Sequence, residues 1–235
     1  MIEITSSTEL PANREPFTLI TSDNLKLVAE LATPVQNKSQ AVLLTLHPLP
    51  THGGFMDSHI LRKAANRLPA LADLAVLRFN TRGTTSPQGT SEGSFGDGID
   101  ERRDVEAALE FLKSRGLGPI WLVGWSFGTE LAIKYGFDKD IAGAILLSPT
   151  LRRSGETDLV KWIGSGKKLI ALIPEHDEYL APAAALERFA VLPEAEVIPV
   201  DGAKHLWVGE AATKRVLNEI VRAVNPLRYP LPDTF

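Results

Sequence analysis

The chain has 235 residues, of which 44% are hydrophobic and 23% charged, and it carries a formal net charge of −4 with no cysteine. This size and composition predict a single domain with one large core, spanning residues 1–235. Lysine and arginine are scattered along the chain, which argues against nucleic acid as a partner. The absence of cysteine excludes disulfides, thiolate metal sites and cysteine nucleophiles.

The sequences at the two ends of the chain allow predictions about cellular location and about the C-terminal tail. The N-terminal sequence lacks the basic start and apolar core of a signal peptide, and no apolar run is long enough to span a membrane. We therefore expect a cytoplasmic protein without membrane insertion. The proline-rich tail at residues 226–235 cannot continue a helix, so it is disordered, packs along the body or reaches a neighbouring molecule. The oligomeric state stays open, a homo-oligomer included.

Short apolar runs alternate with longer stretches of helical periodicity. After an N-terminal strand region within residues 1–20, the predicted strands are Leu25–Leu31, Ala41–Leu46, Leu74–Phe79, Ile120–Val123, Ile141–Leu147, Leu169–Ile173 and Val197–Val200. The predicted helices are His59–Leu71, Asp100–Leu112, Thr129–Tyr135, Ala181–Leu192 and Glu210–Val224. This alternation predicts an α/β fold with a mainly parallel sheet and helices on both faces.

Two polar connections interrupt the alternation. Residues 81–98 are rich in Gly, Ser and Thr and follow a predicted strand, so they form either the rim of a site or a mobile connection without substrate contact. Residues 151–166 have room for one short helix, which excludes an independent lid domain. In the helix that begins near Asp100, we expect Ile99 in the apolar stripe and Glu101 on the solvated face.

The pentapeptide from Gly124 to Gly128 directly follows a predicted strand and precedes a predicted helix. This is the setting of a nucleophile elbow, in which a serine occupies a strained strand-to-helix turn, and it makes Ser126 the candidate nucleophile. The alternative is an ordinary glycine-flanked turn between a strand and a helix. Ser91 lies in a second G-x-S-x-G sequence, but no strand precedes it, so we reject it as a nucleophile.

A serine hydroxyl needs a base, and the base needs a carboxylate to orient it. The expected chain order is Ser, then Asp or Glu, then His, and His205 follows the last predicted strand through a short turn, so we assign it as the base. We assign Asp177 as the acid because it lies in the loop after the preceding strand and has a short side chain. Its rivals are Glu175, Glu178 and the lower-ranked Asp201, and we expect His176 to pack in that loop.

An acyl-transfer site also needs backbone N–H donors for the oxyanion of the transition state. We expect one donor from Phe127, the residue after the nucleophile, and the other from Leu49, because its neighbours Pro48 and Pro50 have no N–H. His47 is expected to orient this loop by hydrogen bonding. A zinc site at His47 and His52 lacks a third ligand with matching spacing, so we expect no metal and no cofactor.

Several of these motifs together resemble the serine α/β-hydrolase superfamily: His47-Pro48, Arg82-Gly83, the pentapeptide 124–128, Asp177 and Gly202-Ala203-Lys204-His205. The sequences at residues 47–54 and 205–209 are similar to those of small lidless hydrolases grouped near dienelactone hydrolases and short-chain carboxylesterases. The resemblance covers most of residues 25–225. It implies a mostly parallel sheet of about eight strands, a minimal cap and ester hydrolysis through an acyl-enzyme without a cofactor. The chain departs from the family pattern at His47-Pro48, where the superfamily more often has His-Gly, so the oxyanion loop can follow a different path.

We therefore expect a serine hydrolase that acts on small carboxylic esters. The short connection at residues 151–166 predicts an open cleft and short acyl chains. Four large apolar residues either line that cleft or pack in the core: Phe55, Met56, Trp162 and Trp207. Thioester hydrolysis, acyl transfer and peptide cleavage remain open because they use the same residue types. A non-enzymatic binding protein of the same fold is the alternative from another functional class.

Overall fold

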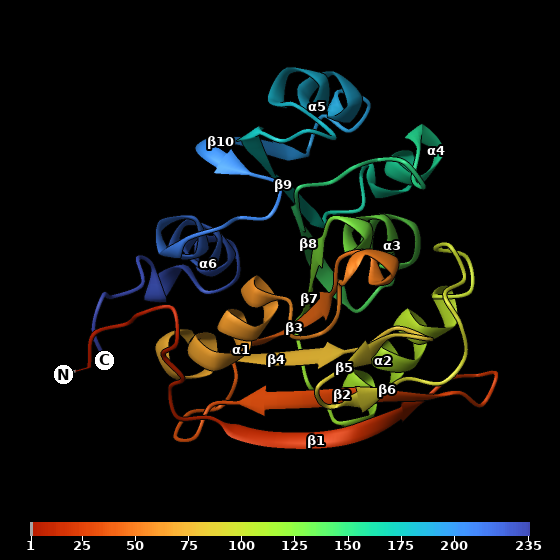
Figure 1. Cartoon of the computed structure of the whole chain (residues 1–235). Coiled ribbons are helices and arrows are strands. Elements are labelled where there is room, and N and C mark those ends of the chain that lie inside the picture. The colour runs from red at the N-terminus through yellow and green to blue at the C-terminus, as the bar shows by residue number, and fades with distance from the viewer. Residues whose placement is uncertain (1) are drawn as a thin grey trace.

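The computed structural model describes residues 2–235, which form a twisted sheet of eight strands and a separate two-stranded hairpin. The order across the sheet is β1-β2-β4-β3-β7-β8-β9-β10. Strand β2 pairs antiparallel with both of its neighbours, β1 and β4, and the remaining pairings are parallel. The strands are β1 (Asn13–Ile20), β2 (Lys26–Thr33), β3 (Ala41–Leu46), β4 (Leu74–Phe79), β7 (Ile120–Trp125), β8 (Ile141–Leu147), β9 (Lys168–His176) and β10 (Glu196–Lys204). Figure 1 shows the antiparallel edge at the bottom and β9 and β10 at the top.

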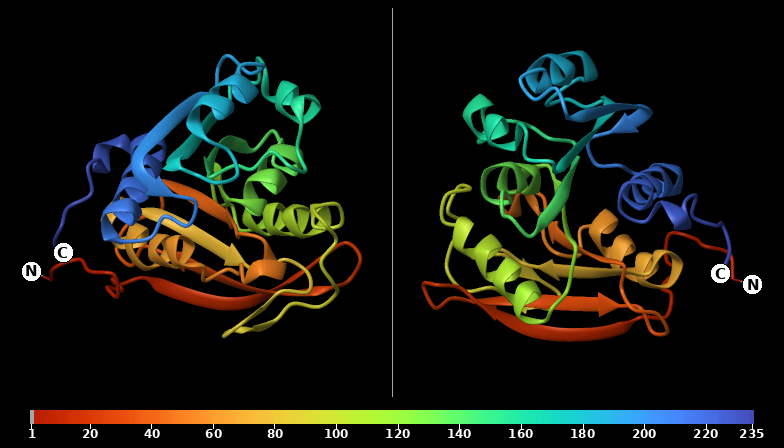
Figure 2. Two further views of the ribbon diagram at one scale, coloured as in Figure 1. Left: turned by 45° about the horizontal axis from the view of Figure 1, so that its top comes forward. Right: turned by 180° about the vertical axis from the view of Figure 1, so that it is seen from behind.

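Helices cover both faces of the sheet, as the alternating pattern predicted. Helices α1 (His59–Ala72) and α6 (Glu210–Val224) lie on one face, whereas α2 (Arg102–Ser114) and α3 (Phe127–Tyr135) lie on the other, as both views in Figure 2 show. The second face is completed by the short α4 (Glu156–Leu159) with the 3₁₀ turn η2 (Val160–Trp162), and by α5 (Pro182–Phe189). Two further 3₁₀ turns are η1 (Pro50–His52) and η3 (Pro226–Arg228). Among residues 2–235, no helix is both long and apolar enough to cross a lipid bilayer.

The apolar strand runs are buried on both faces. In β3, Val42 and Leu44 pack toward α2 and α3, while Leu43 packs toward α1 and α6. Successive side chains of a strand point to opposite faces, so a central parallel strand is apolar at nearly every position, here with Thr45 of β3 and Arg78 of β4 as buried exceptions. For this reason the sequence predicted β3, β4 and β8 with their observed bounds. Strands β9 and β10 continue beyond their predicted ends, where Pro174 and His176 of β9 pair with Val200 and Lys204 of β10.

Two expectations for the start of α2 are wrong. Ile99 is 67% exposed instead of lying in the apolar stripe, and Glu101 is fully buried instead of facing solvent. The Glu101 carboxylate accepts hydrogen bonds from the backbone N–H groups of Gly96 (2.7 Å) and Gly98 (2.8 Å). A buried carboxylate is tolerated when amides satisfy it, and here it holds the loop that precedes the helix.

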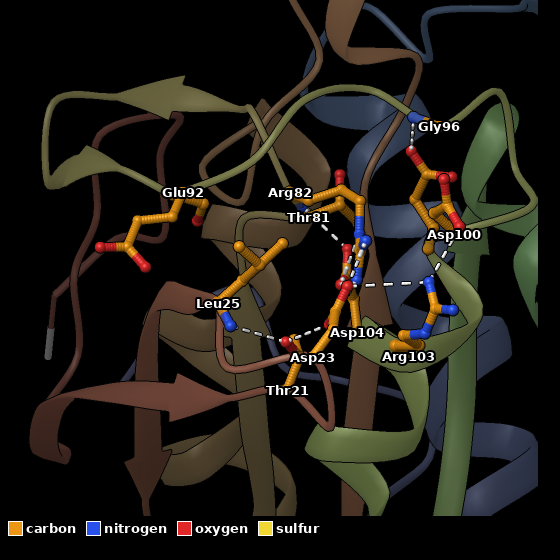
Figure 3. Close-up of polar contacts among 12 residues, drawn as sticks. Thr21, Asp23, Leu25, Thr81, Arg82, Glu92, Gly96, Asp100, Arg103 and Asp104 are labelled. Carbon is orange, nitrogen blue, oxygen red and sulfur yellow. Dashed lines mark hydrogen bonds and ion pairs between the residues drawn. The ribbon is translucent and has the colours of Figure 1, made fainter.

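The polar connection at residues 81–98 is held by a buried arginine with two carboxylate partners. It contains the hairpin of β5 (Thr85–Ser86) and β6 (Gly89–Thr90). Its Arg82 donates a backbone hydrogen bond (2.8 Å) and two guanidinium hydrogen bonds (3.0 and 2.8 Å) to Asp104 of α2, and it also pairs with Asp23 (3.0 Å) between β1 and β2 (Figure 3). The connection is thereby tied both to a helix and to the antiparallel edge of the sheet.

The proline-rich tail packs along the body beside the N-terminus. Ile2 and Phe235 exchange two backbone hydrogen bonds of 2.7 and 2.9 Å, and the two ends of the chain lie together in Figures 1 and 2. Leu231 is buried, and its N–H donates to the side-chain oxygen of Asn218 in α6 (2.8 Å). Of the three alternatives for the tail, the structure shows the packed one.

Replacing Asp104 is expected to destabilise the fold strongly. Asp104→Ala leaves the buried guanidinium of Arg82 without its main partner, and breaking a buried pair costs about 3–5 kcal/mol. The matched control is Glu106→Ala on the exposed face of α2, which removes only a surface pair with Arg102 and should leave stability nearly unchanged. Urea unfolding measures both changes, and equal small losses would contradict this account of the connection.

Candidate active site

Ser126 occupies a sharp turn between β7 and α3. Its φ of 52° and ψ of −113° place a non-glycine residue in a strained backbone region, and its N–H donates to the Leu147 carbonyl of β8 (2.9 Å). The flanking glycines allow this turn. A Cβ at Gly124 would lie 2.5 Å from the Gly128 carbonyl oxygen, and a Cβ at Gly128 would collide with the Leu46 carbonyl at the end of β3. The turn therefore has the geometry of a nucleophile elbow.

His205 bridges Ser126 and Asp177. Its Nε2 lies 3.0 Å from the Ser126 hydroxyl oxygen, and its Nδ1 lies 2.9 Å from a carboxylate oxygen of Asp177. Asp177 and His205 directly follow β9 and β10, so all three residues lie at the carboxyl edge of the parallel sheet. An ionised carboxylate only accepts, so Nδ1 carries the proton and Nε2 is left to accept from the serine hydroxyl. This arrangement can activate the hydroxyl as a nucleophile.

The structure brings Asp177 to His205 and leaves the rival carboxylates elsewhere. The second Asp177 oxygen accepts from the N–H groups of Tyr179 (2.9 Å) and Leu180 (3.3 Å), so the loop itself fixes the carboxylate. Glu175 instead accepts from the N–H of Gly202 (2.7 Å). The remaining rivals, Glu178 and Asp201, are exposed. His176 is also exposed, 3.7 Å from Glu175, so the expectation that it packs in the loop is wrong.

The backbone of His205 has anchors that sequence reasoning missed. Its carbonyl accepts from the Trp125 indole N–H (3.1 Å) and from the Ser148 hydroxyl (3.1 Å). The His59 imidazole lies 2.7 Å from the Leu206 carbonyl and packs edge-on against Trp125. Trp125 is part of the G-x-S-x-G pentapeptide, so its position beside Ser126 was a signal, but its partner 80 positions away could be found only in the folded chain.

The expected oxyanion donors lie on two adjoining segments. Phe127 is the first residue of α3, where a backbone N–H has no acceptor within its own helix. The Leu49 N–H makes no hydrogen bond to any described residue of the chain. Leu49 follows β3, whose end lies against the start of α3 at Gly128. Both N–H groups are thus free to serve a ligand.

His47 orients the loop by hydrogen bonding, as expected. Its buried ring lies with Nδ1 2.7 Å from the Pro48 carbonyl, while Nε2 accepts from the N–H and hydroxyl of Thr81, each at 3.1 Å. Burial lowers the pKa of His47 to about 4, although the hydrogen bond to Pro48 acts in the opposite direction. The ring is therefore neutral at pH 7. His52 is exposed and its Nδ1 lies 3.1 Å from the Thr51 hydroxyl, so the two imidazoles have separate partners.

Most of the large apolar residues proposed for the cleft belong to the core. Met56, Trp162 and Trp207 are each at most 2% exposed, whereas Phe55 is half-buried. The rejected Ser91 is buried, and its hydroxyl donates to the Asn80 carbonyl (2.9 Å) and accepts from the Val28 N–H (3.0 Å). Ser91 therefore fastens the connection after β4 to β2.

Known proteins share this sequence pattern and fold. The model of the alpha/beta hydrolase family matches residues 46–232. An uncharacterized protein of Rickettsia prowazekii is 33% identical over 97 residues, which cover 40% of this chain and 38% of that protein. The chain thus matches well under half the length of that curated relative.

Three solved structures are similar over nearly their whole length. A serine hydrolase without a lid from Xanthomonas campestris has a TM-score of 0.76 and 22% identity, covering 96% of this chain and 100% of that one. A serine hydrolase homologue from Coxiella burnetii has a TM-score of 0.74 and 22% identity (92% and 99%), and an esterase of Pyrococcus furiosus has 0.70 and 20% (91% and 94%). These similarities confirm the predicted α/β-hydrolase fold. Within residues 2–235 it has a mostly parallel sheet of eight strands and no lid.

The buried His47 is expected to make stability depend on pH. Its folded pKa of about 4 lies below the ordinary value of 6.5, so the unfolded chain takes up a proton as pH falls through 6.5 while the folded protein does not. The free energy of unfolding therefore decreases between pH 6.5 and pH 4. From pH 7 to pH 5, urea unfolding should show wild type losing about 2 kcal/mol more than His47→Gln.

His59, whose pKa burial also lowers, is present in both proteins, so the difference between them isolates His47. Parallel loss of stability in the two proteins would contradict a neutral, buried His47.

Proposed function

The chain belongs to the alpha/beta hydrolase family, as its motifs predicted, and on that basis we propose that it is a serine hydrolase of small carboxylic esters. The proposal rests on one observation, the hydrogen-bonded series from Ser126 through His205 to Asp177, with distances of 3.0 and 2.9 Å. The residue types, their chain order and these distances support the roles of nucleophile, base and orienting acid in acyl transfer.

In the proposed reaction, the Ser126 oxygen attacks the ester carbonyl carbon while Nε2 of His205 takes the hydroxyl proton. The tetrahedral intermediate collapses, the bond to the alcohol oxygen breaks, and His205 returns the proton to the leaving alcohol. Water then attacks the acyl-enzyme with His205 again as the base, which releases the carboxylic acid and restores Ser126. Asp177 keeps the imidazole in the required tautomer and stabilises its charged form.

Negative charge on the carbonyl oxygen would be stabilised by the N–H groups of Leu49 and Phe127. The first turn of α3 supports this role because the helix N-terminus carries partial positive charge. The contacts of His47 support it as well, because they hold the Pro48 carbonyl and thus the peptide group that contains the Leu49 N–H. Donors fixed in advance are often the largest contribution to such catalysis.

Small esters are favoured by the short connection after β8. Residues 151–166 contain only α4 and η2 as regular structure, so no large apolar cover is available for a long acyl chain. The presence of an esterase among proteins of the same fold agrees with ester cleavage. Relative kcat/KM values for matched ester, thioester and peptide substrates test this choice, and a thioester or peptide preference would contradict it.

Ser126→Ala is expected to lower kcat for 4-nitrophenyl acetate by about 10⁴-fold or more, because the nucleophile is lost. Its melting temperature should stay within a few degrees of wild type. The matched control is Ser91→Ala, which alters the other G-x-S-x-G serine and should keep full activity per folded molecule. A fluorophosphonate probe should label wild type and not Ser126→Ala. Equal activity or equal labelling of wild type and Ser126→Ala would contradict the assignment of Ser126 as the nucleophile.

Asp177→Asn is expected to lower kcat by about 10³–10⁴-fold, because an amide can hold the imidazole in the wrong tautomer. Glu178→Gln, one position along the same loop, changes an exposed carboxylate and serves as the control. Steady-state kinetics with 4-nitrophenyl acetate measure both. A larger loss for Glu178→Gln than for Asp177→Asn would show that Asp177 is not the orienting acid.

A further inference from the structure

The turn after β8 is held rigidly by a buried carboxylate. Glu130 of α3 is fully buried, and it accepts from the backbone N–H groups of Arg152 (2.8 Å), Arg153 (3.3 Å) and Ser154 (2.7 Å). The Thr150 hydroxyl also donates to it (2.6 Å). Backbone amides and hydroxyls thus satisfy Glu130, and the arginine side chains of the turn project from a fixed backbone.

Arg152 lies one aromatic ring away from His205. Its guanidinium carbon is 4.9 Å from the centre of the Tyr179 ring, and the centres of the Tyr179 and His205 rings are 4.5 Å apart. Contact with an aromatic face restricts the long arginine side chain and leaves the N–H groups at its edge available. The turn after β8 therefore places a cation at the rim of the Ser126 site.

Arg152 has no ion-pair partner among residues 2–235. By contrast, the next residue, Arg153, is paired with Asp97 (2.6 Å). A second arginine without an ion pair in the described chain, Arg188 of α5, donates to the Leu151 carbonyl of the same turn (3.2 Å). Two arginines without an ion pair, one on the turn after β8 and one on α5, thus meet at this turn, although the whole chain is acidic.

We propose that Arg152, with the charge of Arg188 at the same turn, binds a carboxylate carried by the substrate, so that the preferred substrates are esters with a negatively charged group. A guanidinium presents paired N–H donors that match the two oxygens of a carboxylate. Because the charge lies beside the reacting groups and not on them, it selects the substrate without taking part in bond cleavage. This inference rests on the proposed ester hydrolysis.

The test compares anionic esters with neutral esters of similar size in wild type, Arg152→Gln and Arg152→Glu. One pair, 4-nitrophenyl hydrogen succinate and 4-nitrophenyl butyrate, places the charge on the acyl side. The other pair, 4-acetoxybenzoate and its methyl ester, places it on the leaving group. In at least one pair, the anionic-to-neutral ratio of kcat/KM should fall about tenfold in Arg152→Gln and further in Arg152→Glu, mainly through KM. The wild-type ratio should also fall in high salt.

The matched control is Arg115→Gln, which removes the same charge from the far end of α2, where Arg115 pairs with Glu15. Its ratios should equal those of wild type. If Arg152→Gln leaves both ratios within about twofold of wild type while the neutral esters are still cleaved, the carboxylate site is wrong and the ester hydrolase stands. If wild type cleaves none of the four esters and no probe labels Ser126, both proposals are wrong.

Discussion

The close approach of three backbone segments at Gly124 and Gly128 is the constraint on which the site depends. The end of β3, the turn at Ser126 and the first turn of α3 meet at distances that leave no room for a Cβ at either glycine. This contact holds the serine backbone in its strained conformation and carries the Phe127 N–H beside it. It also fixes where the loop after β3 begins, and therefore where the Leu49 N–H can lie. A strained residue persists only where its surroundings hold it in this way.

Buried carboxylates perform the same task in several loops at the carboxyl edge of the sheet. Glu101 accepts from amides before α2, Asp104 from Arg82, Glu130 from the turn after β8, and Asp177 from its own loop. A carboxylate can accept several hydrogen bonds at once, so one side chain can fasten a whole turn. The loops that surround Ser126 are therefore held by polar groups drawn from the helices and loops beneath them.

The contacts of His47 connect two of these loops. Thr81 begins the connection that Arg82 and Asp104 anchor, and its N–H and hydroxyl both donate to His47. The opposite side of the ring meets the Pro48 carbonyl. Protonating this ring would place a donor against the Thr81 N–H, so the neutral form suits the site. The stability of the fold and the geometry of the proposed oxyanion donors thus share one buried side chain.

The sequence by itself determined the alternation of strands and helices, the elbow at Ser126 and the candidates His205 and Asp177. These follow from local patterns, because a strand buried on both faces is almost continuously apolar and a strained turn needs its glycines. The tertiary structure decided what depends on distant neighbours. The helical pattern predicted a solvated Glu101, but the folded chain surrounds its carboxylate with loop amides. The position of Arg152 near the site depends on its contact with Tyr179, which in turn packs against His205. A residue's type limits the hydrogen bonds and charges it can offer, but only the folded chain supplies the partner.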